Sequence, residues 1–184
     1  QYASNTTRGV REVVKWATSQ FPAMSIDNKL AIVGPNREFV RKLKSALPLD
    51  ELEAAVGSRV RLVSAVEAAE REFVELFDPV VEGDEQWIVV DSLSNIDGLE
   101  RPAVIAVGMD TIRIGSVDGM VASRSDIYRA VTRANVLVIV VNELIKGGWL
   151  EWLSRVQITA DAKFDTANEQ KIGRGVAAHE RLEQ

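Results

Sequence analysis

The rhythm of hydrophobic and polar positions changes near residue 29. Before it, apolar residues recur at helical spacing, which predicts one amphipathic helix over residues 8–21 behind a loose polar start at residues 1–7. After it, short apolar runs alternate with helical segments. Strands are predicted at residues 30–33, 59–63, 87–90, 103–107, 136–141 and 156–159.

Local signals predict where the helices between these strands begin and end. Pro35-Asn36 opens a helix that runs to about Leu47. Capping boxes are predicted for three further helices, from Asp50 with Glu53, Ser64 with Glu67, and Ser123 with Asp126. Gly57 closes the first of these helices, Asp78-Pro79 the second, and the third ends near Ala134. Residues 109–122 show little periodicity and are interpreted as a loop.

Continuous apolar strands that alternate with helices predict an α/β fold. We expect a three-layer αβα domain around a mostly parallel sheet of about five to six strands. Residues 1–28 are interpreted as an N-terminal helix and linker, 29–159 as this domain, and 160–184 as a polar tail. Ligands of such sheets gather beyond the carboxyl ends of the strands, so residues 34–37, 91–100 and the Asp110 loop are the expected functional edge.

Composition narrows the function classes. The 184 residues carry 22 Lys+Arg and 27 Asp+Glu, a net charge of -5, and no Cys, which excludes disulfides and thiolate metal sites. The acidic balance argues against a general nucleic-acid coat. There is no apolar run of membrane-spanning length and no visible leader, so we expect an intracellular protein without membrane contact. The single histidine, His179, lies in the polar tail and is expected to be a bystander.

Three well-known catalytic motifs are missing from these 184 residues. No glycine is followed by lysine, so the phosphate loop GxxxxGK[ST] does not occur, and neither do GxSxG or HExxH. Arg129 and Arg133 stand four residues apart on the predicted helix 123–134, where two guanidiniums share one side and suit phosphate oxygens. The alternative is that the helix dipole and nearby glutamates satisfy both arginines.

Two other segments carry weaker signals. Gly98 permits a turn, and Glu100 is able to bind a ribose or hold a neighbouring arginine; the alternative is an ordinary capped turn. Arg37 stands at a predicted helix N-terminus, which attracts anions, although a strand-to-helix turn there needs no ligand.

Taken in order, three segments resemble the second RecA-like lobe of superfamily 1 helicases, the UvrD/Rep-like group. Residues 29–40 (Lys-Leu-Ala-Ile-Val-Gly-Pro-Asn-Arg-Glu-Phe-Val) are similar to motif IV. Residues 91–100, which end in Gly-Leu-Glu before a buried strand, are similar to motif V. Residues 127–134 (Ile-Tyr-Arg-Ala-Val-Thr-Arg-Ala), again before an apolar strand, match motif VI most closely.

The resemblance implies a set of roles. Arg133 matches the arginine that reaches the γ-phosphate of ATP held between two lobes, and Glu100 matches the glutamate near the nucleotide sugar. Gly98, Arg37 and Arg129 complete the expected nucleotide site, whereas Tyr128 and Thr132 are expected to pack. The implied cofactor is ATP with Mg, bound only when a first lobe is present, with none intrinsic. The implied partners are that lobe, in the same longer chain or another subunit, and single-stranded nucleic acid.

The chain departs from the family pattern in ways that keep a second function open. Asp97 replaces the usual basic or amide residue, the threonine and histidine of motif V are missing, and there is no first lobe in these residues. The alternative is a catalytically inactive, helicase-derived interaction or scaffold module, with Trp149 and Trp152 as a docking surface. Aromatic residues at helical spacing equally fit packing of that helix into the core. A stand-alone nucleotide-binding domain is the weakest reading, because no glycine-rich phosphate fingerprint supports it.

Overall fold

The structure is a computed structural model that describes residues 2–20, 26–77, 85–110, 117–143, 145, 146, 148, 150 and 151. These residues fall in one compact unit, Gln1–Glu151; the remaining Trp152–Gln184 form a second unit that is not described. The expected strand 156–159, the polar tail with His179, and the aromatic residues Trp149 and Trp152 therefore lie outside the described residues.

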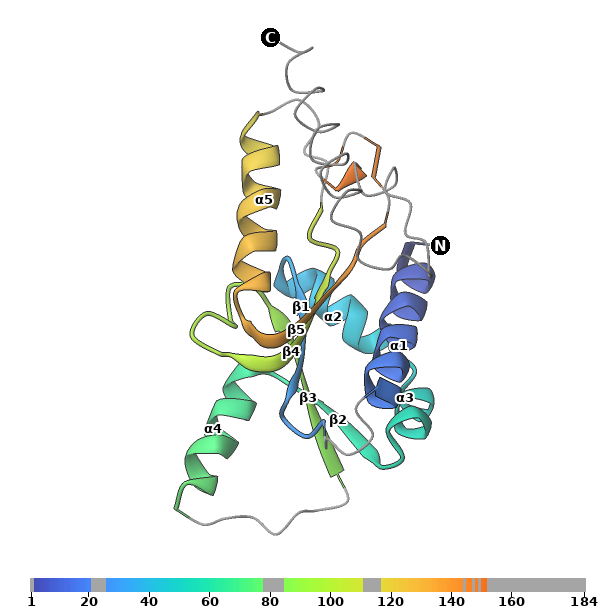
Figure 1. Cartoon of the computed structure of the whole chain (residues 1–184), viewed down its shortest axis with the longest axis vertical. Helices are drawn as coiled ribbons and strands as arrows, with labels where there is room; N and C mark the ends of the chain where they lie inside the picture. Colours follow the sequence, from blue (N-terminus) through green and yellow to red (C-terminus); the bar gives the residue numbers. More distant parts are fainter. Residues whose placement is uncertain are drawn as a thin grey trace, which may run out of the picture. The chain divides into compact units, whose positions relative to one another are not determined.

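The described residues alternate between helices and strands (Figure 1). In chain order the elements are α1 (Tyr2–Gln20), β1 (Leu30–Gly34), α2 (Arg37–Ala46), α3 (Leu49–Val56), β2 (Arg59–Val63), α4 (Ala65–Glu75), β3 (Glu85–Ser92), β4 (Arg101–Val107), α5 (Val117–Val131) and β5 (Ala134–Val141).

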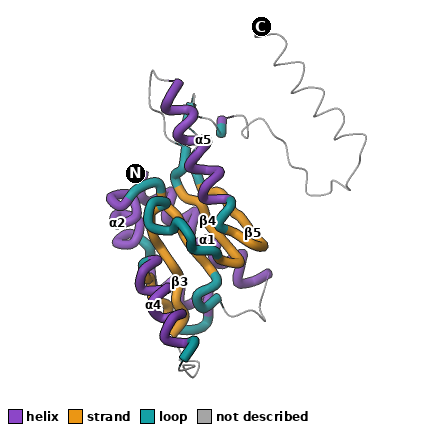
Figure 2. The backbone as a smooth tube through the Cα atoms, turned by 90° about the vertical axis from the view of Figure 1, so that its left-hand side faces the viewer, coloured by secondary structure: helices purple, strands orange, loops and turns teal. Residues whose placement is uncertain are grey.

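The five strands form one sheet in the order β2-β3-β1-β4-β5, and every neighbouring pair is parallel. Buried apolar side chains cover both faces of this sheet. The core on one face joins the sheet to α1, α2 and α3; the core on the other joins it to α4 and α5. Figure 1 shows the same layers, with α4 and α5 on the side of the sheet away from α1, and Figure 2 views the molecule from the side of α4 and α5. The predicted α/β class and three-layer αβα architecture are confirmed.

Two of the predicted helix starts are confirmed in atomic detail. The Asn36 side chain accepts a hydrogen bond from the Phe39 N–H and caps α2. Ser64 and Glu67 form a reciprocal capping box at α4. Gly57 ends α3 in the left-handed conformation, at φ 79°.

The predicted capping box of Asp50 and Glu53 is wrong. Helix α3 starts two residues earlier than predicted, after Pro48, which has no side chain able to cap it, and Asp50 lies inside the first turn. The Glu53 carboxylate instead accepts a hydrogen bond from the Val60 N–H, 3.1 Å away, and ties α3 to β2. The Glu53 side chain, which the local pattern assigned to a helix cap, therefore bonds a residue of the neighbouring strand instead.

Two helices are longer than their sequence signals. Helix α1 begins at Tyr2 rather than after a loose start, and Thr6 and Thr7 are buried in spite of their polarity. Helix α5 begins at Val117 rather than Ser123, and it passes through Gly119, which costs about 1 kcal/mol relative to alanine inside a helix. It ends at Val131, before Arg133.

Candidate functional site

The predicted site residues lie at two opposite edges of the sheet. Arg37 is the first residue of α2, beyond the carboxyl end of β1. Glu100 immediately precedes β4, and Arg133 immediately precedes β5. Because all strands are parallel, their amino-terminal ends lie together at one edge of the sheet, the amino edge, and Glu100 and Arg133 lie there. Arg37 lies at the opposite, carboxyl edge, where the strands end.

A backbone hydrogen bond joins the two segments at the amino edge. The Arg101 N–H donates to the Arg133 carbonyl oxygen over 2.9 Å, and Arg101 pairs with Ala134 as β4 and β5 begin. The Gly-Leu-Glu segment and the Thr-Arg-Ala segment, about 30 residues apart in the sequence, therefore meet in space. Gly98 has φ 88° there, the left-handed conformation that glycine adopts without strain.

Arg133 does not lie within a helix, contrary to the sequence prediction. It lies in the turn after α5, where its N–H donates to the Ala130 carbonyl oxygen over 3.2 Å. Arg129 and Arg133 therefore do not share one side of a continuous helix. The Arg133 side chain is half-buried, and its Nε is buried without a hydrogen-bond partner. A buried donor without a partner costs stability, and the Nε of Arg101 is in the same state.

Arg129 already has an acidic partner. Its Nη2 donates to the Asp97 carboxylate over 2.5 Å, and Asp126 lies 4.0 Å from its Nη1. Asp97 thus neutralises Arg129. Ile127 and Ala130 of α5 lie in the core. Tyr128, which was expected to pack, is instead 69% exposed.

Sequence reasoning missed Arg101, the most buried charged group at this edge. It is 4% exposed, and its guanidinium bonds the Glu100 carbonyl oxygen at 2.8 Å, the Asn28 side chain at 3.1 Å and the Glu72 carboxylate at 3.0 Å. Burial lowers the pKa of Arg101, and Glu72 partly opposes this effect. The only sequence signal was an arginine placed directly before a buried strand.

A polar network next to Arg101 ties the amino ends of β1 and β3 to α4. Asp27 accepts two hydrogen bonds from Arg71, at 3.0 and 2.8 Å, and one from the Trp87 N–H at 2.7 Å. The Arg61 and Arg71 guanidiniums lie over the Trp87 ring, 5.0 and 4.5 Å from its centroid. The Trp87 ring is thus engaged in cation–π contacts within the fold.

At the carboxyl edge, Arg37 is exposed and belongs to a short chain of hydrogen bonds. Its Nη2 donates to the Asn95 side chain, and Asn95 donates to the buried Asp91 carboxylate, which also accepts from the Ala65 N–H. Arg37, Arg41 and Lys44 line a shallow groove beside the end of β3. These three cations stand at i, i+4 and i+7, on one side of α2.

The crevice where an open α/β sheet usually binds a ligand is filled by a side chain. Strands β1 and β4 are neighbours whose following helices, α2 and α5, pack on opposite faces, which makes their carboxyl ends the switch point. Gly34 and Gly108 lie there, and a Cβ on either would stand within 2.8 Å of the Phe39 ring. The aromatic ring thus occupies the place where a phosphate cradle would be expected.

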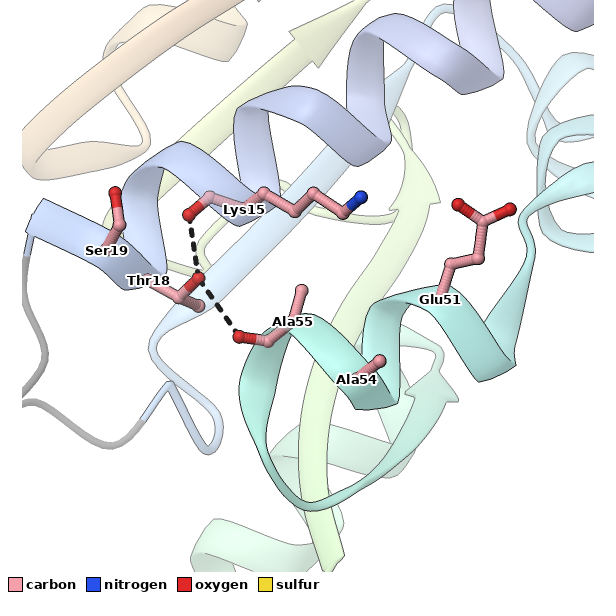
Figure 3. A pocket seen from close by; sticks show the side chains of 6 residues that line it. All are labelled: Lys15, Thr18, Ser19, Glu51, Ala54 and Ala55. Atoms are coloured by element: carbon pink, nitrogen blue, oxygen red, sulfur yellow. Dashed lines mark hydrogen bonds between the residues drawn. The ribbon is translucent and has the colours of Figure 1, made fainter.

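A second groove lies away from the predicted site residues. It lies between α1 and α3 and is lined by Lys15, Thr18, Ser19, Glu51, Ala54 and Ala55 (Figure 3). The Thr18 hydroxyl bridges the two helices through the carbonyl oxygens of Lys15 and Ala55. None of the predicted site residues is among its lining.

Within the part of the chain that the structure describes, no helix is long and apolar enough to cross a membrane. The same residues include no group of three or more carboxylate or histidine side chains able to hold a metal ion.

No protein-family model matches the chain, and neither does any curated protein sequence. Among solved structures, the chain is similar to the C-terminal domain of a possible DNA helicase from Lactobacillus plantarum WCFS1. The two share 22% identity at a TM-score of 0.39, over 73% of this chain and 68% of the other.

Proposed function

We propose that this chain is the second RecA-like lobe of a superfamily 1 type, ATP-dependent nucleic-acid helicase. In this role Arg133 reaches the γ-phosphate of an ATP that a first lobe holds with Mg, and Glu100 lies near the nucleotide sugar. The observation that carries the proposal is the 2.9 Å hydrogen bond between Arg101 and Arg133, which joins the two motif-like segments at one edge of the sheet.

The state of the Arg133 side chain supports this role. Its buried Nε has no hydrogen-bond partner, whereas Arg129 is paired with Asp97. Arginine stays charged and bonds phosphate oxygens through two donors at once. An arginine that stabilises the charge on a transferring phosphoryl group is worth about 10³–10⁵ in rate. Of the two motif VI arginines, Arg133 is therefore the one we assign to the γ-phosphate.

The proposal requires a first lobe. These 184 residues contain no GxxxxGK[ST], and the Phe39 ring fills the switch-point crevice of the sheet. The phosphates and Mg must therefore be held by another lobe, in a longer chain or in a separate subunit.

The proposal assigns a different ligand to the carboxyl edge. Arg37, Arg41 and Lys44 form a row that suits a phosphodiester backbone, because cations along one line neutralise successive phosphates. Since Arg37 lies across the sheet from Arg133, we assign Arg37 to single-stranded nucleic acid rather than to the ATP that Arg133 would reach.

One observation favours the alternative, an inactive scaffold module. The Asp97–Arg129 ion pair places a carboxylate within the expected nucleotide site, where it opposes an anionic ligand. Under this alternative, ATP turnover does not depend on Arg133, whichever first lobe is present.

ATP hydrolysis by the chain together with its first lobe tests the proposal. We expect no hydrolysis by these 184 residues alone, and strand-stimulated hydrolysis once the first lobe is present. The Arg133→Ala variant should then hydrolyse ATP at least about 10³-fold more slowly than the wild type. Arg59→Ala is the matched control, because Arg59 is exposed at the amino end of β2 and should keep wild-type turnover. Equal turnover by Arg133→Ala and Arg59→Ala would rule out the arginine-finger role.

A further inference from the structure

Helix α4 exposes a large apolar surface. The exposed fractions are 60% for Val66, 64% for Phe73, 53% for Val74, and 77% for both Leu76 and Phe77 in the turn that follows the helix. These five make up half of the large exposed hydrophobic side chains among the described residues. Contiguous exposed apolar surface on a folded domain commonly marks an interaction site.

The exposed residues form a continuous stripe because of their spacing. Val66, Phe73 and Phe77 stand seven and four residues apart, so they share one side of the helix, and Ala69 stands between them. The Phe73 and Phe77 rings meet edge to face with centroids 5.3 Å apart. The opposite side of α4 is the one that packs on the sheet, through Ala65 and Ala68. Helix α4 therefore has two apolar sides, and only the inner one belongs to the core.

The charge on the outer side of α4 is negative. Glu70 lies within the stripe and lines a shallow groove with Val66, Ala69, Phe73 and Val74. The one basic residue of the helix, Arg71, is turned away and is held by Asp27 and Glu75. An apolar stripe with a carboxylate inside it needs an occupant that offers both apolar side chains and a cation.

We propose that this face of α4 binds an amphipathic helix of a partner protein, through an apolar stripe that carries a lysine or arginine opposite Glu70. A groove lined by a helix suits apolar anchors at helical spacing, and a cation across the interface pairs with Glu70. A second copy of the chain fits worse, because an isologous contact presents the same acidic surface from both sides. This inference concerns a protein partner and does not depend on the ATPase role of Arg133.

A designed peptide provides the test. The probe is a fluorescein-labelled helical peptide of about 18 residues, with leucine on one side and lysine beside it; a matched peptide carries glutamate in place of lysine. Fluorescence anisotropy is measured against the 184-residue chain. We expect the lysine peptide to bind and the glutamate peptide to bind at least about tenfold more weakly.

Variants of the chain then locate the binding site. Phe73→Ser and Glu70→Lys should each weaken the lysine peptide about tenfold or more. Their controls are Tyr128→Ser, which also removes an exposed aromatic ring, and Asp50→Lys, which makes the same change in net charge. Both controls should bind like the wild type, and thermal melts check that all four variants fold.

Two results would overturn the inference. One is a binding assay that does not point to the α4 face. This is the outcome if the lysine peptide binds all four variants equally, or if it does not bind the wild type at all, because the α4 face would then have no affinity for a basic helix. The other is a wild-type dimer in sedimentation that Phe73→Ser converts to monomer, because the face would then be an interface between two copies of the chain.

Discussion

At the scale of single residues, the packing of Phe39 decides what the carboxyl edge of the sheet is able to do. The ring lies between Gly34 and Gly108, at the ends of two neighbouring strands, where other α/β proteins bind ligands. Gly108 is constrained twice, by its φ of 64° and by a Cβ that would stand 2.7 Å from the ring. The sequence shows an ordinary Val-Gly pair here, so only the structure reveals that the crevice is filled.

Gly108→Ala should therefore destabilise the fold more than Gly98→Ala. Both substitutions put alanine at positive φ, which costs about 1 kcal/mol, but a Cβ at Gly98 has no atom within 4 Å. The added methyl at Gly108 overpacks against Phe39, for a further ~1–3 kcal/mol. Urea unfolding measures the difference. Adding Phe39→Leu to Gly108→Ala should restore part of the loss, and equal losses for the two glycines would show that the ring does not constrain Gly108.

At the scale of elements, helix ends and strands were predictable where local chemistry decides them. The Asn36 cap, the Ser64–Glu67 capping box and the Gly57 terminus follow from short-range hydrogen bonds, so the sequence is sufficient to predict them. The start of α1 and the cap of α3 depend on tertiary contacts, because buried threonines extend one helix and Val60 takes the Glu53 carboxylate from the other. Such contacts have no short-range sequence pattern.

The capping box of α4 should make stability depend on pH. The Ser64 N–H and hydroxyl both donate to the Glu67 carboxylate and lower its pKa. A carboxyl group whose pKa is lowered by folding adds stability that is present above its unfolded pKa and is lost as pH falls through the folded pKa. Ser64→Ala should cost about 1 kcal/mol at neutral pH.

Urea unfolding of wild type and Ser64→Ala, from neutral pH down through the folded pKa of Glu67, checks the direction of this pH dependence. The gap between their free energies of unfolding should narrow on acidification, because protonated Glu67 accepts poorly from Ser64. Ser45→Ala is the control, since this exposed hydroxyl bonds only the Lys42 carbonyl oxygen of its own helix. A gap that stays constant or widens toward acid pH would contradict the role of the Glu67 charge.

At the scale of the whole molecule, the sheet separates two groups of candidate site residues. Arg133 and Glu100 lie at the amino edge, and Arg37 with Arg41 and Lys44 lies at the carboxyl edge. The alternation of strands and helices was enough to predict the three-layer fold, because each segment carries its own periodicity. The separation follows from strand direction and order, and the pairing of Asp97 with Arg129 follows from how the loop before β4 reaches α5. No spacing in the sequence encodes either of them.

We propose above all that Arg133 acts on an ATP bound by a first lobe. The most direct measurement is single-turnover hydrolysis, together with ATP affinity, for wild type and Arg133→Ala in the presence of that lobe. We predict that the rate of the chemical step falls by about 10³-fold or more while ATP affinity changes far less, because a finger acts mainly on the transition state. An unchanged rate of the chemical step, with the fold intact, would rule out the action of Arg133 on the transferring phosphoryl group.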